Sequence, residues 1–391
     1  MKINRTIKYA AIFYVTAFVC YIFGLCLGGL LRGFTPIEIF VSKGSTIVDF
    51  FIVSTVMLIF SYPVVVVSAA LHEFGHCLFG WMSGYKFVSF RVLDRVLIRK
   101  DGKFGVKRFN IPGTLGQCLM MPPDRPIDKI PMVWYMLGGV VMNLLLLLAS
   151  ALILWKVSFP VYLDMLLFCL LWMLLLVNAY LLIANGIPMQ IRGVVNDAKN
   201  AILIRNNSQN KQSLVQILRV NSALQNGIIP KDMPEEWFAH IDLASVEGQI
   251  AEGMAMGKFA VMFDRFLFAE SLEWMEKIYA ANEMTGIMKY EYECEIVFLS
   301  LILGKKERAE ELWGDEKLRK YCEAQKPYSS AKCRLYWAVA KYIEEKDAKA
   351  DKIFAHIKEN RARFLLAGEV KSDIAIIEHV LAEEKKTQSE G

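Results

Sequence analysis

The chain has 391 residues, a hydrophobic content of 55% and a mean hydropathy of +0.33, which together exclude an ordinary soluble enzyme. The formal net charge of +5 is modest, and no interleaving of basic with aromatic residues indicates a base-stacking surface, so no nucleic-acid partner is expected. The apolar residues are concentrated before residue 190, whereas the remainder is charged and mixed. This distribution predicts a membrane-embedded half followed by a soluble half.

Four segments exceed the ~20 apolar residues that a membrane-spanning helix needs: 9–31, 47–71 extending towards 82, 131–155 and 160–186. The first is too long for a signal peptide and lacks a small-residue cleavage site, so we expect it to be a retained anchor. The second, drawn as one helix to residue 82, would overshoot the hydrocarbon core of about 30 Å. We therefore expect it to bend or tilt, with Pro63 as the natural kink.

The second segment ends in His72-Glu73-Phe74-Gly75-His76, an H-E-x-x-H sequence. One helical turn separates the two histidines, so both imidazoles lie on one face and can bind the same Zn²⁺, while Glu73 can reach a water on the metal. At the inner end of a membrane helix, this motif predicts hydrolysis at or inside the bilayer. Catalytic zinc usually has three protein ligands, so the two histidines require a third.

The loop between the second and third segments is basic. From residue 84 to residue 130 it carries ten Lys and Arg residues against four aspartates, which predicts a cytoplasmic loop and places both termini and the histidines towards the cytoplasm. Residues 87–92 alternate between polar and apolar, and an Asp-Gly turn at 101–102 precedes residues 104–109, so a small β-hairpin is expected. This hairpin is either a simple connector or an edge to which a substrate adds as a strand.

A candidate third zinc ligand follows the fourth segment. Residues 185–197 contain Asn185, Pro188 and Asp197, and Asp197 is expected on the same membrane side as the histidines. The other carboxylates fit less well, because they are placed near the outer ends of the segments or within the hairpin; they are Asp49, Asp94, Asp101 and Asp164.

The remaining residues predict a helical soluble domain over 198–382, with a disordered tail over 383–391. Residues 299–313 partly echo residues 340–354 with Ala309 aligned to Ala350, which favours either a weak tetratricopeptide-like array or a generic helical bundle, and such a domain could bind a protein partner. The predicted fold is an all-α membrane protein with about four transmembrane helices and a small cytoplasmic β-hairpin region. It consists of an N-terminal transmembrane anchor and outer loop over 1–46, an intramembrane core over 47–197, and then the soluble helical domain.

Three segments resemble, in order and spacing, the motifs of the site-2 protease family, the intramembrane zinc metalloproteases. They are His72-Glu73-Phe74-Gly75-His76, Gly139-Val140-Val141-Met142-Asn143, and Asn185-Gly186-Ile187-Pro188 leading to Asn196-Asp197. The resemblance covers roughly residues 47–200, without room for a PDZ domain between the core helices. It implies that His72, His76 and Asp197 are zinc ligands, that Glu73 is the general base and that Asn143 is a polar group near the site. We expect Asn143 to be a catalytic residue rather than a purely structural helix–helix contact.

Three positions depart from the family pattern. Val140 stands where many relatives have proline, Gly186 replaces a usual apolar residue, and Ala198 follows Asp197 where glycine is expected. Gly193 supplies the glycine of a longer variant of the third motif.

The resemblance implies a zinc-dependent endopeptidase in a bacterial cytoplasmic membrane that cleaves transmembrane segments of membrane-anchored proteins or pro-peptides. Its substrate helix must unwind locally, because peptide carbonyls in a bilayer are locked in helical hydrogen bonds. One alternative is a catalytically inactive membrane adaptor that binds partners through the helical domain. Another is a different zinc protease class in which Glu270 or Glu273 is the third ligand.

Overall fold

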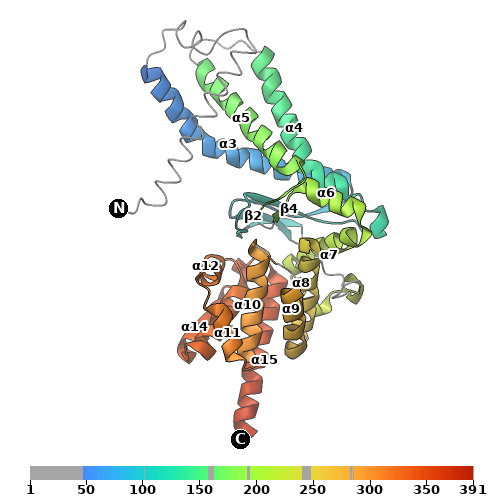
Figure 1. Ribbon diagram of the computed structural model, residues 1–391, viewed down its shortest axis with the longest axis vertical. Helices are drawn as coiled ribbons and strands as arrows, with labels where there is room; N and C mark the ends of the chain where they lie inside the picture. Colours follow the sequence, from blue (N-terminus) through green and yellow to red (C-terminus); the bar gives the residue numbers. More distant parts are fainter. Residues whose placement is uncertain are drawn as a thin grey trace. The chain divides into compact units, whose positions relative to one another are not determined.

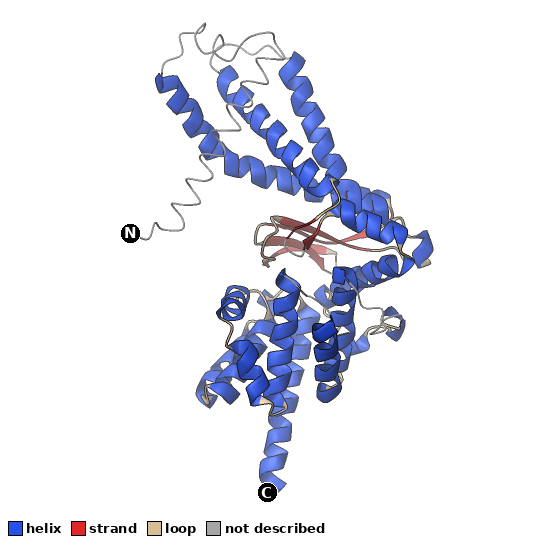
Figure 2. Cartoon of the chain, in the orientation of Figure 1, coloured by secondary structure: helices blue, strands red, loops and turns tan. Residues whose placement is uncertain are grey.

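The computed structural model describes residues 47–100, 102–156, 163–191, 194–239, 248–281, 284 and 286–390. The predicted first crossing, residues 9–31, lies outside them. Helices make up most of the described chain, and the strands are few (Figure 2). The described residues form two compact units. One consists of the residues up to Gly75 with Gly138–Ile187, and the other of His76–Leu137 with the residues from Pro188 onwards. The helices Ile47–Met82 and Met132–Lys156 each contribute to both units.

Three of the described helices are long and apolar enough to cross a membrane. They are α3 (Ile47–Met82), α4 (Met132–Lys156) and α5 (Leu163–Gly186), with candidate spans at Thr55–Met82, Ile127–Lys156 and Leu167–Gly186. These spans agree with three of the four predicted segments.

Helix α3 is continuous over 36 residues and changes direction partway along its length (Figure 1). Pro63 lies inside it, as the sequence predicts, and a proline there removes one hydrogen-bond donor and clashes with the preceding turn. Around this region Met57 and Val64 of α3 pack against Cys169 and Met173 of α5. Near the bend, one side of α3 is therefore packed against α5.

The closest approach of α3 to α4 depends on Gly75, within the H-E-x-x-H motif. A Cβ atom at this position would lie 2.3 Å from the carbonyl oxygen of Gly138, a distance that no side chain can occupy. The two glycines therefore let the helix backbones touch, which brings the facing side chains of α3 and α4 within hydrogen-bonding range.

The expected hairpin is part of a four-stranded antiparallel sheet with the strand order β3-β2-β1-β4. The strands are β1 (Lys86–Val92), β2 (Arg95–Lys100), β3 (Lys103–Arg108) and β4 (Gly116–Met121). The prediction found β1, β3 and the glycine turn, where Gly102 has a φ of 78°. It missed β2, because the turn before it places Leu93 at a φ of 54° and offers Asp94 as its single turn-favouring residue.

One face of the sheet contributes to a small core. Cys118 and Met120 of β4 pack with Tyr135 of α4 and with Val215 and Leu218 of α7 (Ser208–Gln225). Tyr135 also donates a hydrogen bond from its hydroxyl to the carbonyl oxygen of Cys118, at 2.7 Å. This core holds the start of α4 against the sheet.

The C-terminal half is helical, as predicted. Its further helices are α6 (Asp197–Asn206), α8 (Gly248–Asp264), α9 (Phe268–Ala281), α10 (Gly286–Ile302), α11 (Lys306–Trp313), α12 (Glu316–Gln325), α13 (Ser330–Ala338), α14 (Asp347–Glu359) and α15 (Ala367–Glu390), with a π-helical turn at Val339–Ile343 and 3-10 turns at Pro230–Asp232, Glu235–Trp237 and Arg361–Arg363. A further 3-10 turn, Ile127–Lys129, lies before α4. The prediction of a disordered tail from residue 383 was wrong for the described residues, since α15 continues to Glu390. Charged residues there sustain the helix, and Lys386 pairs with Glu383 one turn away.

The two echoing segments occupy equivalent places in helical pairs. Ala309 lies in α11 and Ala350 in α14, and both side chains are buried. Each segment enters its helix through a residue in the left-handed region, Gly304 at a φ of 71° and Glu345 at 55°. Both spacings are 41 residues (350 − 309 and 345 − 304), which is longer than the ~34 of a tetratricopeptide repeat. The repeat class stays a prediction.

Candidate metal centre

His72 is held by a chain of neutral hydrogen bonds through three apolar helices. Its Nδ1 lies 2.5 Å from Oδ1 of Asn143 on α4, and Nδ2 of Asn143 donates to Oδ1 of Asn178 on α5, at 2.8 Å. Nδ2 of Asn178 in turn donates to the carbonyl oxygen of Leu174 and to the hydroxyl of Ser68, one turn before His72 on α3. Both asparagines and Ser68 are fully buried.

The direction of this chain determines the tautomer of His72. A backbone carbonyl only accepts hydrogen bonds, so the amide nitrogen of Asn178 must face Leu174, which leaves its oxygen to accept from Asn143. The oxygen of Asn143 then faces His72, whose Nδ1 must carry the proton. Nε2 of His72 consequently keeps its lone pair, as a metal ligand requires.

His76 is oriented in the same manner by the backbone. Its Nδ1 lies 2.7 Å from the carbonyl oxygen of Tyr135, so it donates there and Nε2 again keeps the lone pair. The Tyr135 ring packs edge-to-face on the imidazole with 6.0 Å between ring centroids and is stacked on Tyr85. Both histidines are buried, with 7% and 8% of their surfaces exposed.

Asp197 is the first residue of α6, and the loop before it is closed by Asn196. The side-chain oxygen of Asn196 caps α6 by accepting from the amide of Lys199 and also accepts from the amide of Met189. Between these residues, the two-residue strands β5 (Gln190–Ile191) and β6 (Val194–Val195) pair antiparallel. The pairing of β5 with β6 and the Asn196 cap together fix the position of Asp197 at the start of α6.

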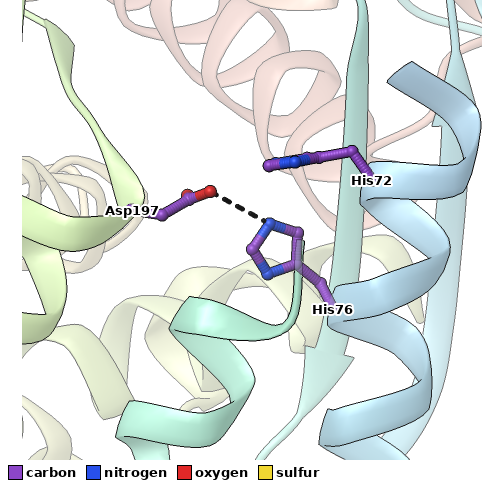
Figure 3. Close-up of side chains that lie close together, drawn as sticks. All are labelled: His72, His76 and Asp197. Atoms are coloured by element: carbon purple, nitrogen blue, oxygen red, sulfur yellow. Dashed lines mark ion pairs between the residues drawn. The ribbon is translucent and has the colours of Figure 1, made fainter. Parts of the chain in front are cut away.

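The structure brings together the three residues that the sequence predicts as zinc ligands. One ligand atom from each of His72, His76 and Asp197 lies within 4.8 Å of the others, and Nε2 of His76 is 3.4 Å from Oδ2 of Asp197 (Figure 3). In a tetrahedral zinc site with bonds of about 2.0–2.1 Å, neighbouring ligand atoms are separated by roughly 3.4 Å. Two imidazole nitrogens and one carboxylate are also a donor set that zinc prefers. The residues therefore fit this metal.

Glu73 and Asn143 occupy different places around the three ligands. Glu73 is half-buried on α3, about 100° around the helix from His72 and about 60° from His76, so it borders the face that carries both imidazoles. Asn143 contacts the His72 ring through its Oδ1 and so orients this imidazole. The catalytic role that the sequence predicts for Asn143 stays a prediction.

Two residues of the site were missed by the sequence analysis. Asn178 sets the orientation of the Asn143 amide, and Tyr135 supplies the carbonyl that orients His76. A polar residue in an otherwise apolar helix was a usable signal for Asn178, since such a group must find a partner in a bilayer. No sequence signal marks Tyr135, because its backbone makes the contact.

Two of the departures from the family pattern meet in space. A Cβ atom at Gly186 would lie 3.2 Å from Cγ1 of Val140, which is tighter than an ordinary van der Waals contact. Val140 therefore faces Gly186, and a side chain larger than hydrogen at position 186 would crowd this valine. The third departure, Ala198, is buried in the first turn of α6.

The alternative prediction named Glu270 or Glu273 as the third zinc ligand, and the described structure groups neither with the two histidines. Glu270 and Glu273 belong to α9, where Glu273 is exposed and pairs with Lys277. Among the described residues, Asp197 is the carboxylate that joins the two histidines in one group. Comparison of the chain with protein-family models, with curated proteins and with solved structures gives no match.

Proposed function

We propose that the chain is a zinc-dependent intramembrane endopeptidase. The observation that carries this proposal is the convergence of His72, His76 and Asp197, with both imidazoles held in the tautomer that presents Nε2. Bound at these residues, Zn²⁺ supplies a Lewis acid and a water of lowered pKa.

In this mechanism the protein's own groups orient the ligands and move one proton. The Asn143 amide and the Tyr135 carbonyl hold the two imidazoles in place. Glu73 accepts the proton of the attacking water and returns it to the amine of the departing peptide, as a general base and then a general acid. The peptide bond breaks by addition of water across it, so no oxidant or further reactant is needed.

A membrane location is supported by the surface of the long helices. Leu145, Leu148 and Leu152 on α4 are 52%, 56% and 56% exposed, although leucine is among the most often buried residues. A lipid environment would cover such a surface. We propose a multi-pass protein of a bacterial cytoplasmic membrane whose substrates are membrane-anchored proteins or peptides with locally weak helices, because an intact helix shields its carbonyl groups.

The first test is the zinc content of the full-length protein purified in detergent. The wild type is expected to hold close to one zinc per chain, and His72→Ala and Asp197→Ala are expected to lose it. Asp94→Ala is the matched control, because Asp94 lies in the turn between β1 and β2 and pairs with Arg108. Retention of zinc by Asp197→Ala would redirect the search to another ligand.

The second test separates catalysis from metal binding. Glu73→Gln is expected to retain zinc and to slow cleavage of a single-span test protein, whose transmembrane helix contains a central glycine and proline, by about 10²–10⁴-fold. Unchanged cleavage would overturn the role of Glu73. A wild type that holds no zinc, even after zinc is added, would instead support the adaptor function.

A further inference from the structure

The β2–β3 hairpin presents an apolar and cationic face that the proposed chemistry does not use. Leu97 is 38% exposed, Phe104 65% and Val106 64%. In the antiparallel register Leu97 lies opposite Val106, and Arg99 lies opposite Phe104. Residues two apart on a strand share a face, so these four side chains form one patch near the Gly102 turn.

Basic residues surround this patch. Residues 95–108 contain six Lys and Arg residues and one acidic residue, Asp101. Some of these cations are engaged by the protein, since Arg95 and Arg108 pair with Asp94 and Lys107 donates to the carbonyl oxygen of Phe364. Arg99 and Lys103, at the tip, are exposed, and the Arg99 guanidinium lies 5.9 Å from the centre of the Phe104 ring.

The sheet is fixed to the last turns of α3. The amide of Tyr85 donates to the carbonyl oxygen of Gly80, at 2.9 Å, and a Cβ atom at Gly80 would lie 2.4 Å from Sδ of Met120 on β4. Only three residues separate the end of α3 from the start of β1. Trp81 and Met82, the last residues of α3, are 71% and 69% exposed, and tryptophan is enriched where membrane helices reach the interface. The hairpin is therefore attached where a candidate membrane helix ends.

We propose that the β2–β3 hairpin docks on the surface of an anionic bilayer, with Phe104, Val106 and Leu97 at the acyl-chain boundary and Arg99 and Lys103 at the lipid phosphates. Apolar side chains with flanking cations are the combination that binds anionic membranes. Such docking would hold the start of α4, and with it the Tyr135 carbonyl that orients His76, at a constant depth. The inference rests on the membrane location in the proposed function, not on catalysis.

A fluorescent amino acid at position 104 tests this docking in the full-length protein. The protein is placed in nanodiscs of phosphatidylcholine alone or of phosphatidylcholine with phosphatidylglycerol, and quenching by brominated acyl chains is measured. Strong quenching is expected with phosphatidylglycerol. Because each basic residue near an anionic surface contributes roughly a five-fold factor, Arg99→Gln with Lys103→Gln should shift the docked-to-undocked ratio by about 25-fold. The matched control, Lys352→Gln with Arg361→Gln, removes two exposed cations of the helical half and should change nothing.

The same fluorophore at Leu148 of α4 distinguishes the possible failures. Quenching at 148 without quenching at 104, in either lipid, would overturn the docking and leave the membrane location intact. Absence of quenching at both positions would overturn the membrane location itself. The fluorophore at position 104 could also be shielded from water in detergent, and more strongly at higher protein concentration. That result would assign the patch to contact with a second copy of the chain and would also overturn the proposal.

Discussion

The molecule contains two buried polar networks that are built from different chemistry. Around His72, the network in the apolar helices is neutral and consists of Asn143, Asn178 and Ser68. In the helical half, Arg334 of α13 donates to Glu295 of α10 and to Asp373 of α15, each at 2.6 Å, and its guanidinium lies 4.1 Å from the Phe298 ring centre. The first network can set a tautomer, whereas the second joins three helices through charge.

The difference suits the membrane location and the metal site that we propose. An uncompensated charge among apolar helices in a bilayer is expensive, while an amide satisfied on both sides costs little and has a fixed direction of donation. Ion pairs in the helical half have no such direction, but each requires its partner to stay in place. We therefore expect damage to the neutral network to alter metal binding, and damage to the charged network to alter stability.

The largest effect is expected from Arg334→Met, which removes the charge while keeping much of the side-chain volume. Glu295 and Asp373 would then remain buried without compensation, which typically costs about 3–5 kcal/mol. Urea unfolding of the helical half should show this loss, and the zinc content should not change. Loss of zinc in the folded variant would contradict the separation of the two networks.

The neutral network is tested by Asn178→Ala. Loss of Asn178 frees the Asn143 amide to rotate, so the His72 tautomer is no longer fixed, and outer-sphere partners of this kind contribute about 10–100-fold to metal affinity. Zinc affinity is measured by competition with a chelator. Asn185→Ala is the matched control, because Asn185 is on the same helix and donates to the carbonyl oxygen of Leu181 in its own helix. Equal losses in both variants would indicate a general effect on α5.

A pH effect on stability is expected in the helical half, from Glu369 of α15 beside Asp373. Burial, and then the neighbouring charge of Asp373, raises the pKa of Glu369 to about 8 from an ordinary value of 4.5. The folded state therefore holds a proton that the unfolded state releases, so the stabilisation is complete below pH 4.5 and is lost as pH rises through about 8. Because Glu369 is partly exposed, we expect a loss of only about 1–2 kcal/mol.

Urea unfolding of the wild type and of Glu369→Gln at pH 5 and pH 8.5 measures this loss. The wild type should lose stability relative to the variant as pH rises. If the difference in unfolding free energy between the two proteins does not change with pH, Glu369 is not the group that titrates.

Regular patterns made much of the fold predictable. The long apolar segments, the helical second half and strands β1 and β3 follow from hydrophobic runs and alternation. Strand β2 was missed because a residue without turn preference, Leu93, occupies the left-handed region, and β4 because its sequence does not alternate. The tail was predicted as disordered from its charge, which also suits an exposed helix.

The candidate site was predictable where chemistry fixes the spacing. His72 and His76 follow from one helical turn, and Asp197 followed from the resemblance and from the side of the membrane. Asn178 could not be assigned, because its role depends on which helix faces it, and the sequence does not give the crossing of α4 with α5. The closeness of Val140 to Gly186 was hidden for the same reason.

The smallest effect is expected for Val140 and Gly186. This test shows whether side-chain packing, rather than the polar contacts, sets the distance between α4 and α5. In Gly186→Ala the new Cβ would meet Val140 at 3.2 Å, so the helices must shift slightly. Val140→Ala should relieve the contact, and a double-mutant cycle of thermal unfolding in detergent should give a coupling of about 0.5–1 kcal/mol. Additive effects would mean that the two helices already have room to adjust. A coupling accompanied by weaker zinc binding would extend the neutral network to the packing of α5, since Asn178 lies on the helix that moves.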